Sequence, residues 1–81
     1  MKERKPNFFD EFQGTTVKAI SKFLDDGSVV VYKGILEGKS RTFIYLRDCE
    51  AVKVKDGKEA DKKKFERIAL NKSIIAMVDF S

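Results

Sequence analysis

The sequence contains no histidine and no tryptophan, and only one cysteine and one proline among its 81 residues. Without histidine, Ser-His-Asp and Cys-His catalysis and imidazole ligation of a metal are excluded, which leaves carboxylates and lysines as the only acid–base groups. A single cysteine also excludes an intrachain disulfide. Cys49 lies in a strand-like run, where we expect a small core hydrophobe rather than a nucleophile. The sequence therefore predicts a protein that is not an enzyme and that uses no cofactor and no metal.

Long apolar runs are also missing. The chain opens with the charged segment MKERKPN, which resembles neither a signal peptide nor a membrane span, so we expect a cytoplasmic protein without membrane contact.

With 81 residues, a single domain over residues 1–81 is close to the lower size limit for one core, so partners are expected. The formal net charge of +4 makes a polyanionic partner plausible without requiring one.

The opening segment has the signals of a short helix over residues 7–13. Asn7 is a good N-cap, Phe8 and Phe12 lie one turn apart on one face, and Gly14 suits the position after a helix end. We expect this helix to lie as an apolar lid on the elements that follow, because it is too short to persist alone.

From residue 17 the pattern becomes that of β-strands, with alternating apolar and polar side chains. Asp26-Gly27 is a hairpin signal, and Gly34 inside the second run favours a sharp bend that could wrap the sheet into a barrel. The fold class expected is mainly β, with a short helix before a strongly bent, five-stranded antiparallel sheet or small open barrel. The strands are expected at residues 17–24, 28–38, 42–54, 65–70 and 74–80.

Residues 55–64 read KDGKEADKKK and mix charges of both signs. A solvated loop is the favoured interpretation over a nucleic-acid contact, because Asp56, Glu59 and Asp61 dilute the lysines and no aromatic residue lies between them.

The last two strands are separated only by the polar step Asn71-Lys72-Ser73, which predicts a tight connection. Residues 74–78 are almost continuously apolar, so both faces of the final strand need cover that a domain this small can scarcely supply. A neighbouring chain could supply it. The residues expected at a subunit interface are Phe65, Ile68, Leu70, Ile74, Ile75, Met77 and Val78.

Two segments resemble motifs of the Sm/LSm and Hfq family. LEGKSRTFIYLRD, residues 36–48, can be laid without a gap on the Hfq motif that spans strands 2 and 3, and LNKSIIAMV, residues 70–78, is similar to the Hfq segment that carries a Lys-His dipeptide. The sequence departs from the family at four positions. Ser40 stands where Asp is usual and Thr42 where an aromatic residue or Met packs on a base, while Asn71 replaces Lys or Arg and Lys72 replaces His or Gly.

The resemblance implies an Sm-like, SH3-like barrel that closes into a ring of five to seven subunits by pairing the fourth strand of one subunit with the fifth of the next. It implies that such a ring binds single-stranded, U- or A-rich RNA as a chaperone or scaffold. The residues that would contact RNA are Lys39, Ser40, Arg41, Thr42, Phe43, Asn71 and Lys72.

Two other interpretations stay open. Asn71 could favour a left-handed turn while Lys72 is merely solvated, which would leave neither residue in contact with RNA. The substitutions at Ser40, Thr42 and Asn71 would also suit a small β-barrel that serves as a protein-interaction or assembly module and has lost the RNA pocket. A catalytic site would need paired carboxylates, for which Asp25-Asp26 and Glu50 are loose candidates, and Asp25-Asp26 is better explained as hairpin-turn chemistry.

Overall fold

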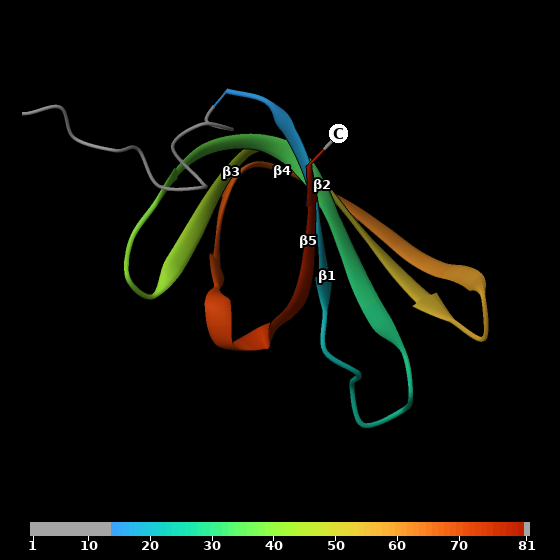
Figure 1. Cartoon of the computed structure of the whole chain (residues 1–81). Coiled ribbons are helices and arrows are strands. Elements are labelled where there is room, and N and C mark those ends of the chain that lie inside the picture. The colour runs from blue at the N-terminus through green and yellow to red at the C-terminus, as the bar shows by residue number, and fades with distance from the viewer. Residues whose placement is uncertain (1–13, 81) are drawn as a thin grey trace, which may run out of the picture.

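The described part of the chain is one antiparallel β-sheet. A computed structural model describes residues 14–80, and of Phe80 only its place in the last strand. The elements in chain order are β1 (Thr16–Ser21), β2 (Val29–Lys39), β3 (Phe43–Lys55), β4 (Lys58–Asn71), the 3-10 turn η1 (Lys72–Ile74) and β5 (Ile75–Phe80). Their order across the sheet is β4-β3-β2-β1-β5, and all neighbours are antiparallel (Figure 1). The expected mainly β fold with five antiparallel strands is confirmed, whereas the helix predicted over residues 7–13 falls outside the described residues.

The largest difference from the sequence prediction concerns residues 55–64. The expected solvated loop was wrong: β3 runs to Lys55, β4 begins at Lys58, and only Asp56 and Gly57 form the turn. Both turn residues have positive φ, 53° and 75°, which is the backbone that a two-residue hairpin turn requires. The alternating charges are tolerated because residues 55–67 are exposed, so the backbone pairing of the hairpin needs no apolar cover on β4.

The bend expected at Gly34 is present. The register between β2 and β3 shifts between Lys33 and Ile35, and Asp48 on the opposite strand adopts a φ of 49°. A β-carbon on Gly34 would lie 3.0 Å from the carbonyl oxygen of Arg47, so only glycine lets the two backbones approach this closely. The long strands β2, β3 and β4 are strongly curved, as the ribbons of Figure 1 show. The close approach at Gly34 permits this curvature.

The core lies on the concave side of the bent sheet. It consists of one cluster of buried side chains, contributed by β1, β2, β3 and β4: Val17, Ala19, Leu36, Ile44, Leu46, Cys49 and Leu70. The prediction that Cys49 is a core residue is confirmed, since its exposed fraction is 1%. Burial raises the pKa of the Cys49 thiol, which keeps it protonated near neutral pH.

The sheet is not closed into a barrel within residues 14–80. β4 and β5 are its two edges, and each therefore has one side without a neighbouring strand in the described chain. Charged side chains line β4 from Lys58 to Lys64, which is a common way of protecting an edge from unwanted pairing. The edge strand β5 instead exposes Met77, and Ile74 lies exposed just before it.

Candidate nucleic-acid interface

The two segments predicted to contact RNA lie side by side at one end of the sheet. One is the turn between β2 and β3, and the other is the connection between β4 and β5 (Figure 1). The backbone N–H of Lys72 donates to the carbonyl oxygen of Thr42 at 2.8 Å, and Phe43 is the register partner of Asn71. The fold therefore brings together residues that are about 30 positions apart in the sequence and that the sequence could link only through the family resemblance.

Ser40 stabilises the turn between β2 and β3 through its hydrogen bonds. Its hydroxyl oxygen accepts the backbone N–H of Phe43 at 2.9 Å and that of Thr42 at 3.3 Å, and its own N–H donates to the carbonyl oxygen of Phe43 at 2.8 Å. These bonds close the turn and leave Arg41 and Thr42 exposed at its apex. Ser40 thus acts as a turn former, and Arg41 is the charged group that the turn presents.

Asn71 plays a similar part in the second segment. Its side-chain oxygen accepts the backbone N–H of Ser73 at 2.9 Å and so caps the short turn η1. The alternative that Asn71 takes a left-handed conformation is wrong, because its φ of −68° and ψ of 126° are extended. Asn71 nevertheless shapes the turn, and it leaves Lys72 at the start of η1 beside Thr42.

An exposed pair of aromatic rings adjoins the turn. The centroids of Phe43 and Tyr45 are 6.4 Å apart, and their side chains are 36% and 38% exposed. Thr42 has no ring, so Phe43 is the aromatic residue among the positions predicted to bind RNA, and Tyr45 lies beside it. Sequence reasoning named Phe43 and missed Tyr45. The signal was the alternation of Phe43 and Tyr45 with the apolar residues Ile44 and Leu46. This alternation places both rings on the face opposite the core.

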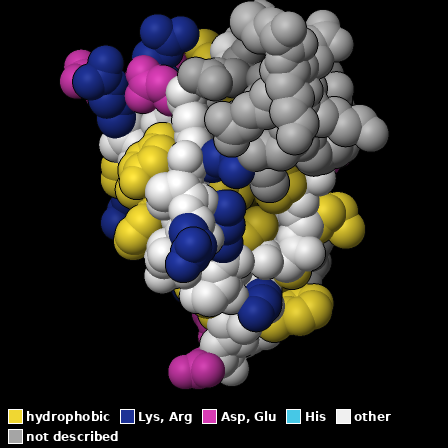
Figure 2. Space-filling view, turned by 60° about the vertical axis from the view of Figure 1, so that its left-hand side comes forward, with side chains coloured by type: hydrophobic (Ala, Val, Ile, Leu, Met, Phe, Trp, Pro, Cys, Tyr) yellow, Lys and Arg dark blue, Asp and Glu magenta, His cyan; other side chains and the backbone are white. Residues whose placement is uncertain are grey.

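Positive side chains accompany these rings. Figure 2, turned so that this end of the molecule comes forward, shows Lys and Arg side chains interspersed with exposed hydrophobic ones. Arg41, Arg47 and Arg67 are all exposed. Arg47 Nε lies 4.0 Å from Asp48, and Arg67 Nε lies 3.7 Å from Glu37, so both ion pairs are loose and solvent-screened.

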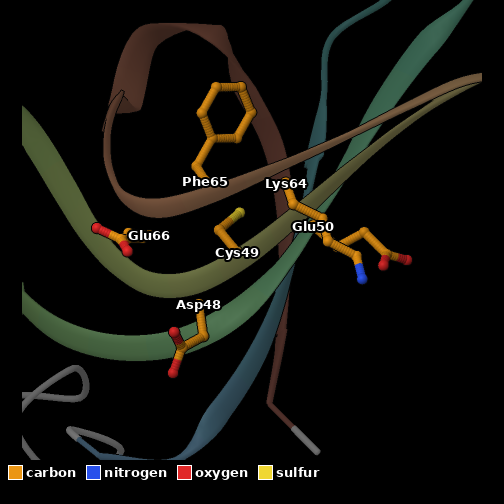
Figure 3. Close-up of a pocket in the computed structure, with 6 residues that line it drawn as sticks. All are labelled: Asp48, Cys49, Glu50, Lys64, Phe65 and Glu66. Carbon is orange, nitrogen blue, oxygen red and sulfur yellow. The ribbon is translucent and has the colours of Figure 1, made fainter.

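A hollow lies elsewhere in the described residues. It measures about 420 Å³ and is lined by Asp48, Cys49, Glu50, Lys64, Phe65 and Glu66. In Figure 3, Phe65 stands above the thiol of Cys49, while Asp48 points to the opposite side of its strand. None of the residues predicted to bind RNA contributes to this hollow. Among residues 14–80, no group of three or more His, Cys, Asp or Glu side chains is placed to hold a metal ion.

The residues predicted at a subunit interface divide into two sets. Leu70 is buried in the core, and Ile68, Ile75 and Val78 are half-buried against that core. Phe65, Ile74 and Met77 are exposed, with exposed fractions of 36%, 43% and 59%. This second set would present the more exposed apolar side chains to a neighbouring subunit.

Fold and site together define the class of this protein as a mainly β protein with one strongly bent five-stranded sheet and a basic, aromatic end. Comparison with known proteins does not narrow that class, because no protein-family model and no curated protein matches the sequence. Within the residues that the structure describes, no helix has the length and apolar character needed to span a membrane.

Proposed function

We propose that this chain is an Sm-like protein that assembles into a closed homo-oligomeric ring of five to seven subunits and binds single-stranded RNA as a chaperone or scaffold in the cytoplasm. The observation that carries the proposal is the hydrogen bond between Lys72 N–H and the Thr42 carbonyl oxygen. It joins the β2–β3 turn to the β4–β5 connection, the two segments whose sequences resemble Sm motifs.

The strand order supports the proposed assembly. Because β4 and β5 are the two edges of the sheet, β4 of one subunit can pair with β5 of the next without displacing any strand within either subunit. Repeating that contact closes a ring, provided that a whole number of rotations from one subunit to the next completes a full turn. A ring would also cover Met77 on β5 and Ile74 just before it, both of which are exposed.

RNA binding in this proposal depends mainly on charge and on the turn. Lys39, Arg41 and Lys72, repeated in every subunit, would form a positive rim that holds phosphates in a salt-sensitive way. Ser40 and Asn71 would support these groups, because their side-chain oxygens already accept backbone N–H groups. Preference for U- or A-rich RNA follows from the family resemblance and is a further part of the proposal.

Fluorescence anisotropy with labelled oligo-U and oligo-A RNA at two salt concentrations tests this function. We expect affinity that falls steeply with salt, and a marked loss in the double variant Asn71→Ala, Lys72→Ala. The matched control is Lys58→Ala, which removes the same charge from the exposed tip of the β3–β4 hairpin and should have a much smaller effect. Absence of binding by the natural protein at low salt would refute the proposal.

A second function, that of a protein-interaction or assembly module, is favoured by one observation. The side-chain oxygens of Ser40 and Asn71, two of the residues expected to contact RNA, already accept backbone N–H groups inside the turns. If this function is the true one, affinity purification recovers the same protein partner with and without ribonuclease treatment, and the oligonucleotides do not bind.

A further inference from the structure

Tyr45 stands between two small residues on the outer face of the sheet. Its register partners are Gly38 on β2 and Ala69 on β4. A β-carbon added to Gly38 would meet no atom within 4 Å, so the β2 side of the ring is open. The ring is 38% exposed although β3 has a neighbouring strand on each side, β4 and β2. An aromatic ring with open flanks is well suited to stack on another planar group.

A shallow hollow of about 250 Å³ adjoins this ring. Its lining residues are Glu37, Tyr45, Leu46, Arg67, Ile68 and Ala69. Sites for drug-sized ligands measure about 300–1,000 Å³, so this hollow suits one smaller planar group. The ion pair between Arg67 on β4 and Glu37 on β2 reaches over β3 and places a guanidinium at the edge of the hollow. Such a guanidinium can stack on a planar ligand or donate to its edge.

The surroundings of the hollow favour an anionic chain as its ligand. Arg47 and Arg67 are direct register partners, which brings two guanidinium groups together, and each has only a loose ion pair, with Asp48 and Glu37 respectively. A phosphate near both would offer them shorter, charge-assisted hydrogen bonds than these loose pairs. Phe43 continues the aromatic surface from Tyr45 toward the β2–β3 turn, where Arg41 is exposed. Adjacent aromatic side chains on a sheet are a known platform for consecutive bases of single-stranded RNA.

We propose that the outer face of β3 and β4 is a base-stacking site for single-stranded RNA, with Tyr45 and Phe43 as stacking rings and Arg47 and Arg67 as the groups that hold phosphate and base edge. This inference rests on the proposed RNA-binding function and deepens it. It adds a contact outside the β2–β3 turn and the β4–β5 connection, and it assigns the stacking role to Tyr45 and Phe43, where Thr42 offers no ring.

The absence of tryptophan from the chain provides a direct test. The variant Tyr45→Trp carries a single indole at the site, and we expect oligo-A RNA to quench its emission over the same concentration range in which anisotropy reports binding. The control variant Phe23→Trp places the indole in the β1–β2 connection, where residue 23 is 81% exposed, and its emission should not change.

Affinity measurements add a second readout. Tyr45→Leu removes the ring but keeps an apolar side chain, and should weaken oligo-A binding about 5- to 150-fold, as expected for one lost base–aromatic stack. Tyr45→Phe keeps the ring and should bind within about two-fold of the natural protein. Circular dichroism confirms that each variant retains the β-sheet before its affinity is compared.

The outcomes separate this inference from the function on which it rests. If anisotropy shows binding while the emission of Trp at position 45 stays constant and Tyr45→Leu binds normally, RNA binds without this face and the inference is overturned. If the emission of Trp at position 45 changes with protein concentration but not on addition of RNA, a neighbouring copy of the chain covers this face. That result also overturns the inference. If the natural protein binds no RNA at low salt, the proposed function itself fails.

Discussion

A β-carbon added to Gly34 would lie 3.0 Å from the carbonyl oxygen of Arg47 and 3.1 Å from Cα of Cys49. Both obstacles are backbone atoms of β3, so no side chain can rotate away to make room. We therefore expect Gly34→Ala to lower the free energy of unfolding by about 1–3 kcal/mol, as overpacking in a well-packed core does. Urea unfolding measures this change. Gly38→Ala is the matched control, because the space at Gly38 is open, and it should be neutral or slightly stabilising.

The ionisation of Asp26 is coupled to the fold by specific contacts. Ser28 donates its hydroxyl and its backbone N–H to this carboxylate, and Lys53 Nζ lies 3.1 Å from it. These contacts, those of Ser28 first, hold the pKa of the Asp26 carboxyl well below its usual range. Because the folded-state pKa is the lower one, the stabilisation is complete above the unfolded pKa of about 3.9 and is lost as the pH falls below it.

The corresponding prediction is a change in the pH dependence of stability. Asp26→Asn should be less stable than the natural protein at pH 7, and this difference should shrink as the pH is lowered from about 5 toward 2. The effect should be small, since the carboxylate is exposed to solvent. Thermal unfolding followed across this pH range measures it. Asp25→Asn removes the same charge without these bonds, so an equal response of both variants would contradict the assignment to Asp26.

At the scale of elements, the five strands were predictable and the length of β4 was not. Alternating side chains located β1, β2 and β3 to within a few residues, because one face of each is buried in the core. The first half of β4 has no buried side chain, so its charged sequence carries no periodic signal, and only the Asp56-Gly57 turn indicated a hairpin. Likewise, the hydrogen bonds by which Ser40 and Asn71 hold their turns could not be predicted, because bonds to neighbouring backbone groups leave no spacing pattern.

The outer β3–β4 hairpin should consequently depend on its turn. Gly57 has a φ of 75°, a conformation that costs a residue with a β-carbon about 1–2 kcal/mol. We expect Gly57→Ala to increase amide hydrogen exchange at residues 58–64 while exchange at the buried Leu46 and Leu70 changes little. Lys58→Ala, next to the turn but without that backbone requirement, serves as the control. A uniform increase across the sheet would mean that the hairpin and the core open as one unit.

At the scale of the whole molecule, the proposed function links assembly through the sheet edges β4 and β5 to RNA binding. A single subunit offers a small basic end, with three exposed arginines and the Phe43–Tyr45 rings. A ring repeats that end at fixed spacing, so a strand that binds one subunit meets the next at high effective concentration. The proposed function thus requires that variants which break the ring also weaken RNA binding, even when they lie far from the RNA-binding residues.

Met77→Lys tests that requirement. Met77 is 59% exposed on the edge strand β5, and a lysine there places a charge where the neighbouring β4 would pack. Light scattering coupled to gel filtration should show a lower mass than that of the natural assembly, and affinity for oligo-U or oligo-A should fall by about 100-fold or more as the avidity is lost. Phe23→Lys makes the same charge change and removes a more exposed apolar side chain from the β1–β2 connection, so it should preserve both mass and affinity.

If Met77→Lys keeps the natural mass, β5 is not the assembly edge. If it becomes a monomer that binds RNA at full strength, recognition needs one subunit alone, and the ring has another role.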